Sequence, residues 1–235
     1  MATPKFSLPY LQSGQAQKHV THNEALNLID ALLPGVVVSA STTSAPGSPA
    51  EGEAYIVPTG GVFGSVTVGE MAVYSGGEWV EILASFGNRV LVLDEGRYRI
   101  NAGSRGWIPG QTIGAFGGTL GLRCIDFEVD LSGGGTQATV AAAIPARAIV
   151  LGVTTWIETN VTGPDQIKVG ISGELSKFGS FIWREAPSSN IGVVGPFATY
   201  ADTDLLVTAQ DDATAFTGGT VGLSVLIIEP GAAPA

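Results

Sequence analysis

The sequence is poor in cysteine, in charge and in long apolar runs. Its 235 residues include one cysteine, Cys124, so an intrachain disulfide is excluded, and we expect Cys124 to be a small core residue rather than a nucleophile. No run approaches the roughly 18 apolar residues of a membrane span, and the first residues lack the apolar stretch of a secretory signal. We therefore expect no membrane insertion and synthesis in the cytoplasm.

Positive charge is scarce as well. Lysine and arginine number 11 against 21 aspartate and glutamate residues, and the net charge of -10 repels phosphate, which argues against a nucleic-acid partner. Only 14% of the residues are charged, whereas 45% are hydrophobic. This balance is unusual for a free monomer, so it predicts that partners cover part of the surface in a homo-oligomer or a larger assembly.

A helix is predicted within residues 1–35, which we interpret as an attachment and assembly segment. The string THNE at 21–24 fits a capping box, and Pro34 and Gly35 end the helical pattern. A heptad-like spacing in the same residues predicts either a short homotrimeric bundle or a helix that docks within its own chain. Its two histidines could hold a metal on a symmetry axis, but we favour a simple polar layer. The seam comprises His19, His22, Leu26, Ile29 and Leu33.

Residues 36–120 predict a β-hairpin module that ends in a glycine-rich linker. Short alternating runs are separated by Gly-rich turns, as in antiparallel hairpins, and the two hairpin segments at 74–79 and 94–98 each end in an aromatic residue. Residues 103–121 are rich in glycine and poor in charge, and we interpret them as a linker or an interface loop. The expected strands are 36–39, 53–57, 70–74, 79–83, 89–93 and 97–100.

Residues 121–230 predict a second β module, and residues 231–235 a disordered tail. Six or more strands without a helical pattern between them favour a jelly-roll-like antiparallel β-sandwich that faces a receptor. The fold class is therefore mainly β: a short N-terminal helix, a β-hairpin module and a C-terminal sandwich. The expected strands of the sandwich are 123–131, 136–143, 147–158, 165–172, 205–210 and 219–229.

The opening of the chain contains an unusual string, QAQKHVTHNEAL at residues 15–26, with LPYL at 8–11 before it and SPAEGEAYIV at 48–57 after it. In these strings the sequence resembles an uncharacterised family of structural proteins from alphaproteobacterial prophages and gene transfer agents. The resemblance implies a virion component of the fibre or spike type, on the tail or the head, that contacts the host surface. It brings no catalytic mechanism and no functional residue to this sequence.

Aromatic residues beside turns are the candidates for a binding site. Tryptophan and tyrosine rings stack on the apolar faces of sugars while Asp and Arg side chains bind the hydroxyl groups, which favours recognition of host polysaccharide. Each aromatic also has a simpler explanation as a core or intersubunit side chain, and we expect Trp156, which alternates within a strand, in the core. The glycan-binding candidates are Trp79, Tyr98, Trp107, Trp183, Arg184, Tyr200, Asp202 and Asp204.

Carboxylates alternate with apolar residues along one predicted strand. Asp126, Glu128 and Asp130 share a face, which would suit a calcium site or a glycosidase pair, but a solvated face that protects a sheet edge is our favoured interpretation. Asp211 and Asp212 are expected in a turn rather than at a metal. We therefore assign no catalytic residue, no metal and no cofactor.

Together these features predict a homotrimeric structural protein of a phage or gene transfer agent, a fibre or spike subunit on head or tail. Its N-terminal segment would bind other virion proteins and its sandwich host polysaccharide, with avidity from many weak sites. We expect the protein to reside in the virion, released from the bacterium by lysis, and not to be an enzyme. Two alternatives stay open: a tail-borne depolymerase that cleaves the polysaccharide, and an architectural adaptor that binds only virion proteins.

Overall fold

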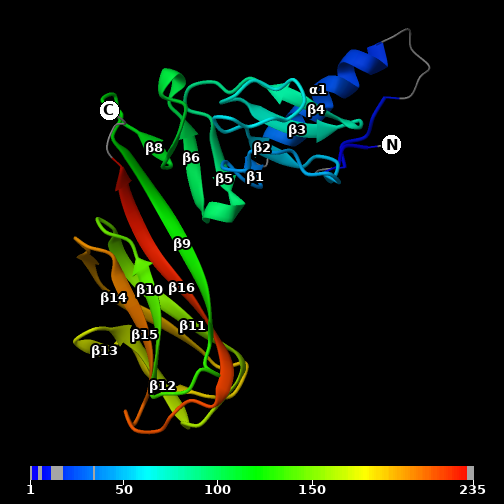
Figure 1. Ribbon diagram of the computed structural model, residues 1–235. Coiled ribbons are helices and arrows are strands. Elements are labelled where there is room, and N and C mark those ends of the chain that lie inside the picture. The colour runs from blue at the N-terminus through cyan, green and yellow to red at the C-terminus, as the bar shows by residue number, and fades with distance from the viewer. Residues whose placement is uncertain (1, 5–6, 12–17, 34, 232–235) are drawn as a thin grey trace. The chain divides into compact units, whose positions relative to one another are not determined.

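Strands make up most of the computed structural model, which describes residues 2–4, 7–11, 18–33 and 35–231 (Figure 1). The chain divides into two units, one that ends at Thr119 and one that begins at Leu120. The first contains the one α-helix of the described residues, and the second contains strands without a helix. The expectation of a mainly β fold with a short N-terminal helix is confirmed.

Helix α1 (Lys18–Leu32) uses one polar side to hold the residues that precede it in the chain. Three polar residues of α1, spaced one or two turns apart, therefore face the N-terminal lead, the name used here for residues 2–4 and 7–11. The asparagine and aspartate oxygens accept these bonds from two hydroxyl groups and one backbone amide. The bonds run from the Thr3 hydroxyl to Asp30 (2.6 Å), from the Leu11 amide to Asn23 (3.0 Å) and from the Tyr10 hydroxyl to Asn27.

The helix begins earlier than the sequence pattern indicates. It already includes Lys18, so Thr21 lies within it and the capping box predicted at 21–24 is wrong. The predicted end is confirmed: the helix ends at Leu32, and Gly35, three residues on, has a φ of 57°, a backbone conformation that glycine adopts without strain.

Strands β2 (Ala54–Ile56), β3 (Met71–Ser75) and β4 (Glu78–Ile82) form an antiparallel sheet that is covered on both faces. Successive residues point to opposite faces, so Ile56 joins a core cluster with Ala31 of α1, whereas Tyr55 packs in a second cluster. The hairpin expected at 74–79 is confirmed: Gly76 and Gly77 both have positive φ and reverse the chain between β3 and β4.

The rest of the N-terminal unit is a second set of short strands. Strand β1 (Val36–Val37) runs parallel to β5 (Arg89–Val92), which pairs with β6 (Arg97–Asn101) in an antiparallel hairpin. The turn between β5 and β6 is the 3-10 helix η1 (Leu93–Glu95). There burial disfavours the charged form of Glu95, but hydrogen bonds from Arg99 and Arg97 outweigh it and hold the pKa of Glu95 below its usual value.

The glycine-rich segment at 103–121 is not simply a linker, so that interpretation is wrong for most of it. It contains the 3-10 helix η2 (Gly103–Arg105) and the strands β7 (Trp107–Pro109) and β8 (Thr112–Ile113). Strand β7 pairs with β6 and brings Trp107 into the core. The six strands expected before this segment are all present, with their ends shifted by two residues at most.

The C-terminal unit is a β-sandwich in which eight long strands form two layers of four. One layer has the order β9-β16-β11-β14 and the other the order β10-β15-β12-β13. The bounds of the eight strands are as follows in chain order: β9 (Thr119–Asp130), β10 (Gln137–Ile144), β11 (Ile149–Thr162), β12 (Gln166–Ile171), β13 (Glu174–Trp183), β14 (Ser189–Ala198), β15 (Thr203–Ala209) and β16 (Gly218–Gly231).

The pairing of these strands is nested, as in a jelly roll. The first strand β9 neighbours the last strand β16, β10 pairs with β15, β11 with β14 and β12 with β13. Side chains from the inner faces of both layers, such as Val153, Ile167, Phe178 and Leu223, form one buried core. The predicted jelly-roll-like sandwich is confirmed.

Two strands of the sandwich, β13 and β14, are missing from the six that the sequence predicts. Each lies at the edge of its layer. An edge strand packs less of its surface, so it tolerates residues that weaken the strand pattern, such as Lys177 in β13 and Pro196 in β14.

Candidate functional site

The outer face of the layer β9-β16-β11-β14 carries the site. Along the central strand β16, Val221, Leu223 and Val225 point into the core and are at most 1% exposed. Gly222 and Ser224, which alternate with them, therefore lie on the outer face. The neighbouring strands β9 and β11 place their own outward residues on both sides of these two.

Trp156 of β11 lies on this outer face, opposite Gly222 of β16. Its sequence neighbours Thr155 and Ile157 are buried, whereas Trp156 is 49% exposed. The prediction that Trp156 belongs to the core is therefore wrong. Because Gly222 has no side chain, the space beside the indole stays open.

This space is a groove of about 380 Å³ that spans three strands. Its floor is strand β16, and its two walls are outward side chains of β9 and β11. Thr154 and Ser224, which are opposite each other in register, add two hydroxyl groups. The groove is lined by Asp126, Phe127, Glu128, Thr154, Trp156, Glu158, Gly222, Leu223 and Ser224.

Three carboxylates line the groove, and they differ in how far they are engaged. Asp126 accepts a hydrogen bond from the Ser224 hydroxyl. Glu128 and Glu158 accept none and form no ion pair within the described residues. The described residues contain no cluster of three or more metal-ligating side chains that could hold an ion. The solvated face that we favoured for Asp126, Glu128 and Asp130 agrees with their exposure.

Cys124 lies on the same outer face and is exposed. The expectation of a core cysteine is wrong. Cys124 is two residues from Asp126 on a regular strand, so both must point to the same side.

Trp183 and Arg184 lie at the end of β13, as the sequence predicted for a turn. Trp183 is 60% exposed and borders a second, smaller hollow of about 260 Å³ together with Phe181 and Asn190. Arg184 forms an ion pair of 2.8 Å with Asp165 between two largely exposed side chains. A ring beside a small hollow could bind a sugar, but its polar partners are fewer than those beside Trp156.

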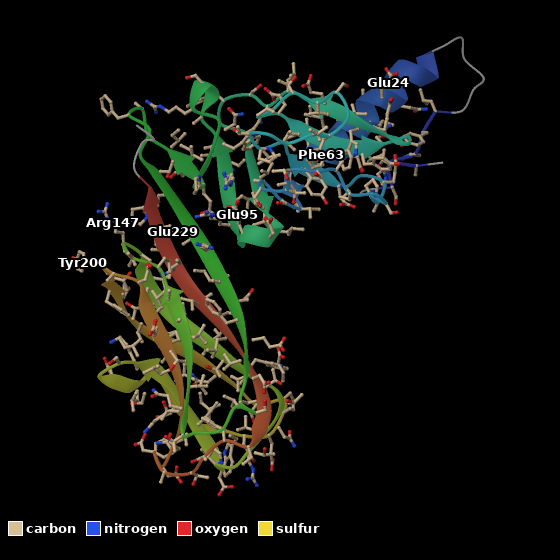
Figure 2. The ribbon with its side chains drawn as sticks, in the orientation of Figure 1. Glu24, Phe63, Glu95, Arg147, Tyr200 and Glu229 are labelled. Atoms are coloured by element: carbon tan, nitrogen blue, oxygen red, sulfur yellow. The ribbon has the colours of Figure 1, made fainter. Side chains whose placement is uncertain are left out.

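Tyr200 follows β14 and is 90% exposed. It points outward at the same end of the unit as Arg147 (Figure 2). Asp202 and Asp204 are exposed, and each accepts one backbone N–H at 2.8 Å: Asp202 from Ala146 and Asp204 from Ala142. Their carboxylates therefore brace the neighbouring connection.

Two of the three candidates in the N-terminal unit are mainly structural. Trp79 is half-buried and packs edge-on against Phe63 and Tyr55, with ring centroids 5.1 and 5.7 Å away. Trp107 is 8% exposed, and its indole N–H donates to the Gly69 carbonyl at 3.0 Å. Tyr98 on β6 is partly exposed.

The proposed assembly seam lies on α1. Within it, Ile29 and Leu33 are 49% and 69% exposed, His22 is exposed, and Leu26 is half-buried. The side chain of His19 lies outside the described residues. An apolar stripe is therefore open on the side of the helix that does not hold the N-terminal lead.

One family model matches part of the chain. The sequence model of a family described as "Protein of unknown function (DUF2793)" matches residues 22–108, which include most of α1 and the strands β1 to β6. The matched residues include the string at 48–57 and only the end of the string at 15–26. No curated protein matches the chain. No helix among the described residues is long and apolar enough to cross a membrane.

A solved phage structure is among those with some similarity to part of the chain. It is titled "Cyanophage Pam1 capsid asymmetric unit", shares 25% sequence identity, and covers 51% of this chain and 91% of its own. The TM-score is 0.37. A likeness of this strength defines neither a fold nor a function, and we draw no conclusion from it.

Proposed function

We propose that the protein is a structural subunit of a phage or gene-transfer-agent particle, of the fibre or spike type, that binds glycans on the host surface through its C-terminal jelly roll. The observation that carries the binding role is the groove beside Trp156. An exposed aromatic ring, hydroxyl groups and uncommitted carboxylates meet in one hollow, which is the arrangement that sugar recognition requires.

The assignment to a particle has its support in the N-terminal part of the chain. The strings at 8–11, 15–26 and 48–57 resemble proteins of prophages and gene transfer agents. In the structure, the first two strings belong to the lead and to α1, which are joined by hydrogen bonds, and the third leads into β2. The N-terminal unit would then bind other virion proteins, and no contribution of nucleic acid or of a membrane is needed.

A homotrimer is the oligomeric state that we propose. The open stripe on α1 supports it, because exposed Ile29 and Leu33 recur at heptad spacing and would be covered in a short bundle. Replacement of both residues by serine should convert trimers into monomers in mass photometry. Leu32→Ser is the matched control, since Leu32 is 43% exposed but lies outside the heptad spacing. A wild-type protein that is monomeric at all concentrations would contradict the proposal.

The proposed function is tested on particles and on cells. Particles from cells that carry the gene are separated on a density gradient, and peptides from both units are measured by mass spectrometry. The protein should sediment with the particles. The purified full chain should bind host cells, and periodate oxidation of the cell-surface sugars should lower this multivalent binding at least about tenfold. Absence from the particle fractions would overturn the structural role.

The two alternative functions give other results in the same experiments. A depolymerase would release reducing ends from host capsule or lipopolysaccharide, whereas we expect binding without release. An architectural adaptor would sediment with particles but would leave cells unbound.

A further inference from the structure

The ring of Trp156 offers two kinds of attraction to a ligand in the groove. Its exposed face can cover the apolar face of a pyranose, and the negative face of the indole π-system attracts a cation. Both attractions act on the open side, beside Gly222. A ligand that combines a sugar ring with a positive charge would use both.

The walls of the groove are negative. None of the described residues that line it is a lysine or an arginine, while Asp126, Glu128 and Glu158 contribute carboxylates. The carboxylate of Glu158 lies close to Gly222, because a methyl group added to Gly222 would be 3.1 Å from the Oε1 atom of Glu158. The carboxylate of Glu158 is thus held over the same space that a ligand on Trp156 would occupy.

We propose that this groove binds a sugar residue with a protonated amino group, in preference to its N-acetylated and its acidic counterparts. An ammonium group donates charge-assisted hydrogen bonds to Glu128 and Glu158, which have no partner within the described residues. A uronic acid or a phosphorylated sugar is repelled by the same carboxylates. The inference rests on the proposed function and names the class of host glycan that its groove selects.

The shape of the groove favours a sugar over a basic protein segment. Its volume of about 380 Å³ is at the small end of the range for pockets that hold small ligands. The Ser224 hydroxyl donates its hydrogen bond to Asp126, so its lone pairs remain to accept a hydrogen bond from a sugar hydroxyl. The Thr154 hydroxyl lies in the same row and can do the same.

The test compares three tetrasaccharides on the full-length protein by isothermal titration calorimetry in mildly acidic buffer. The probes are chitosan tetrasaccharide, its fully N-acetylated form and tetragalacturonate. We expect the chitosan probe to bind at least about tenfold more tightly than the N-acetylated probe at low salt, and tetragalacturonate not to bind. Because exposed charges are screened by salt, about 0.5 M NaCl should remove most of the preference.

Three variants separate the contributions of ring, charge and space. Trp156→Ala should abolish binding of both neutral and amino probes. The isosteric pair Glu128→Gln and Glu158→Gln should lower the preference for the amino probe to near one while the N-acetylated probe still binds. Gly222→Leu should block both probes. Phe116→Ala, which removes an exposed ring in the N-terminal unit, is the control and should bind like the wild type.

Each result decides the proposal. Equal binding of amino and acidic probes, or full binding by Trp156→Ala, would overturn it. So would tighter binding of a lysine-rich peptide to the same residues, which would identify a protein partner. If the groove variants bind host cells as well as the wild type does, the assignment of the binding site to this groove is wrong, and the proposed function stands. If the wild type binds neither cells nor any probe, the glycan-binding function itself fails.

Discussion

At the scale of the residue, one missing side chain makes the groove. Strand β16 supplies its middle row, and a larger residue in place of Gly222 would fill the space between Trp156 and Glu158. The hollow therefore depends on a residue that contributes no chemistry of its own. This explains why the chemistry of the site cannot be recognised from its reactive residues alone.

A carboxylate in the turn before β16 allows a prediction about pH. Asp211 accepts hydrogen bonds from the Thr214 hydroxyl and from the Thr214 and Ala213 amides, and these bonds lower its pKa to about 2. Such a group stabilises the folded state above its unfolded pKa of about 3.9, and this contribution is lost as the pH falls toward 2. Thr214→Val should raise the pKa of Asp211, as measured by NMR titration of its carboxyl carbon.

A second carboxylate, Asp130, supplies the control for that titration. Hydrogen bonds from the Ser132 amide and hydroxyl lower the pKa of Asp130, and neither involves Thr214, so Thr214→Val should leave that pKa unchanged. An Asp211 pKa that stays near 2 in the variant would show that the backbone amides alone are responsible. The same geometry confirms that Asp211 is a turn residue, as predicted.

Two residues show what the sequence already contained but our interpretation missed. Cys124 has the same parity as Asp126 and Glu128, and Trp156 has the same parity as Glu158. Side chains two residues apart on a strand point to the same face, so a residue two positions from a solvent-exposed carboxylate is exposed on that face as well. We assigned Cys124 and Trp156 by residue type instead, since cysteine and tryptophan are commonly buried.

At the scale of the element, edges and registers limit what can be predicted. The central strands of the sandwich are apolar on their inner faces and were predicted with small errors in their ends. The edge strands β13 and β14 were missed. The groove could not be predicted at all, because it depends on the register that sets Trp156 opposite Gly222, and these residues are far apart in the sequence.

Close approach of β14 to β13 gives a prediction about stability. A methyl group on Gly192 would collide with the backbone carbonyl of Phe178, whereas nothing lies within 4 Å of one on Gly195 in the same strand. We expect Gly192→Ala to destabilise the C-terminal unit by about 3 kcal/mol or more, since backbone cannot move aside as a side chain can. Urea unfolding measures the effect.

The matched substitution in β14 isolates the cause. Gly195→Ala changes the same residue type in the same strand without a collision, so its unfolding free energy should stay within about 1 kcal/mol of the wild type. Equal losses in both variants would show that β14 is sensitive to any added methyl group.

At the scale of the whole molecule, the two units have separate hydrophobic cores. One core cluster extends through the C-terminal sandwich. Two further clusters belong to the N-terminal unit, and one of them contains the fully buried Phe63, which is labelled in Figure 2. Because each unit buries its own apolar side chains, the units should unfold in two steps. Scanning calorimetry of the full chain should show two transitions.

Substitutions assign the two transitions. Phe63→Ala removes a ring that packs against Tyr55 and Trp79 at 5.1 Å, and should cost about 3–5 kcal/mol in the N-terminal unit alone. Gly192→Ala should lower the other transition. A single transition that moves with either substitution would mean that the units unfold together.

The nested pairing of the jelly roll also determines how the protein would carry a mechanical load. The chain enters the C-terminal unit through β9, and two walls of the groove are on β9 and β11, with β16 between them. A force applied along the axis of β9 would act on the whole length of its pairing with β16. The bonds between β9 and β16 would be sheared together rather than opened one at a time.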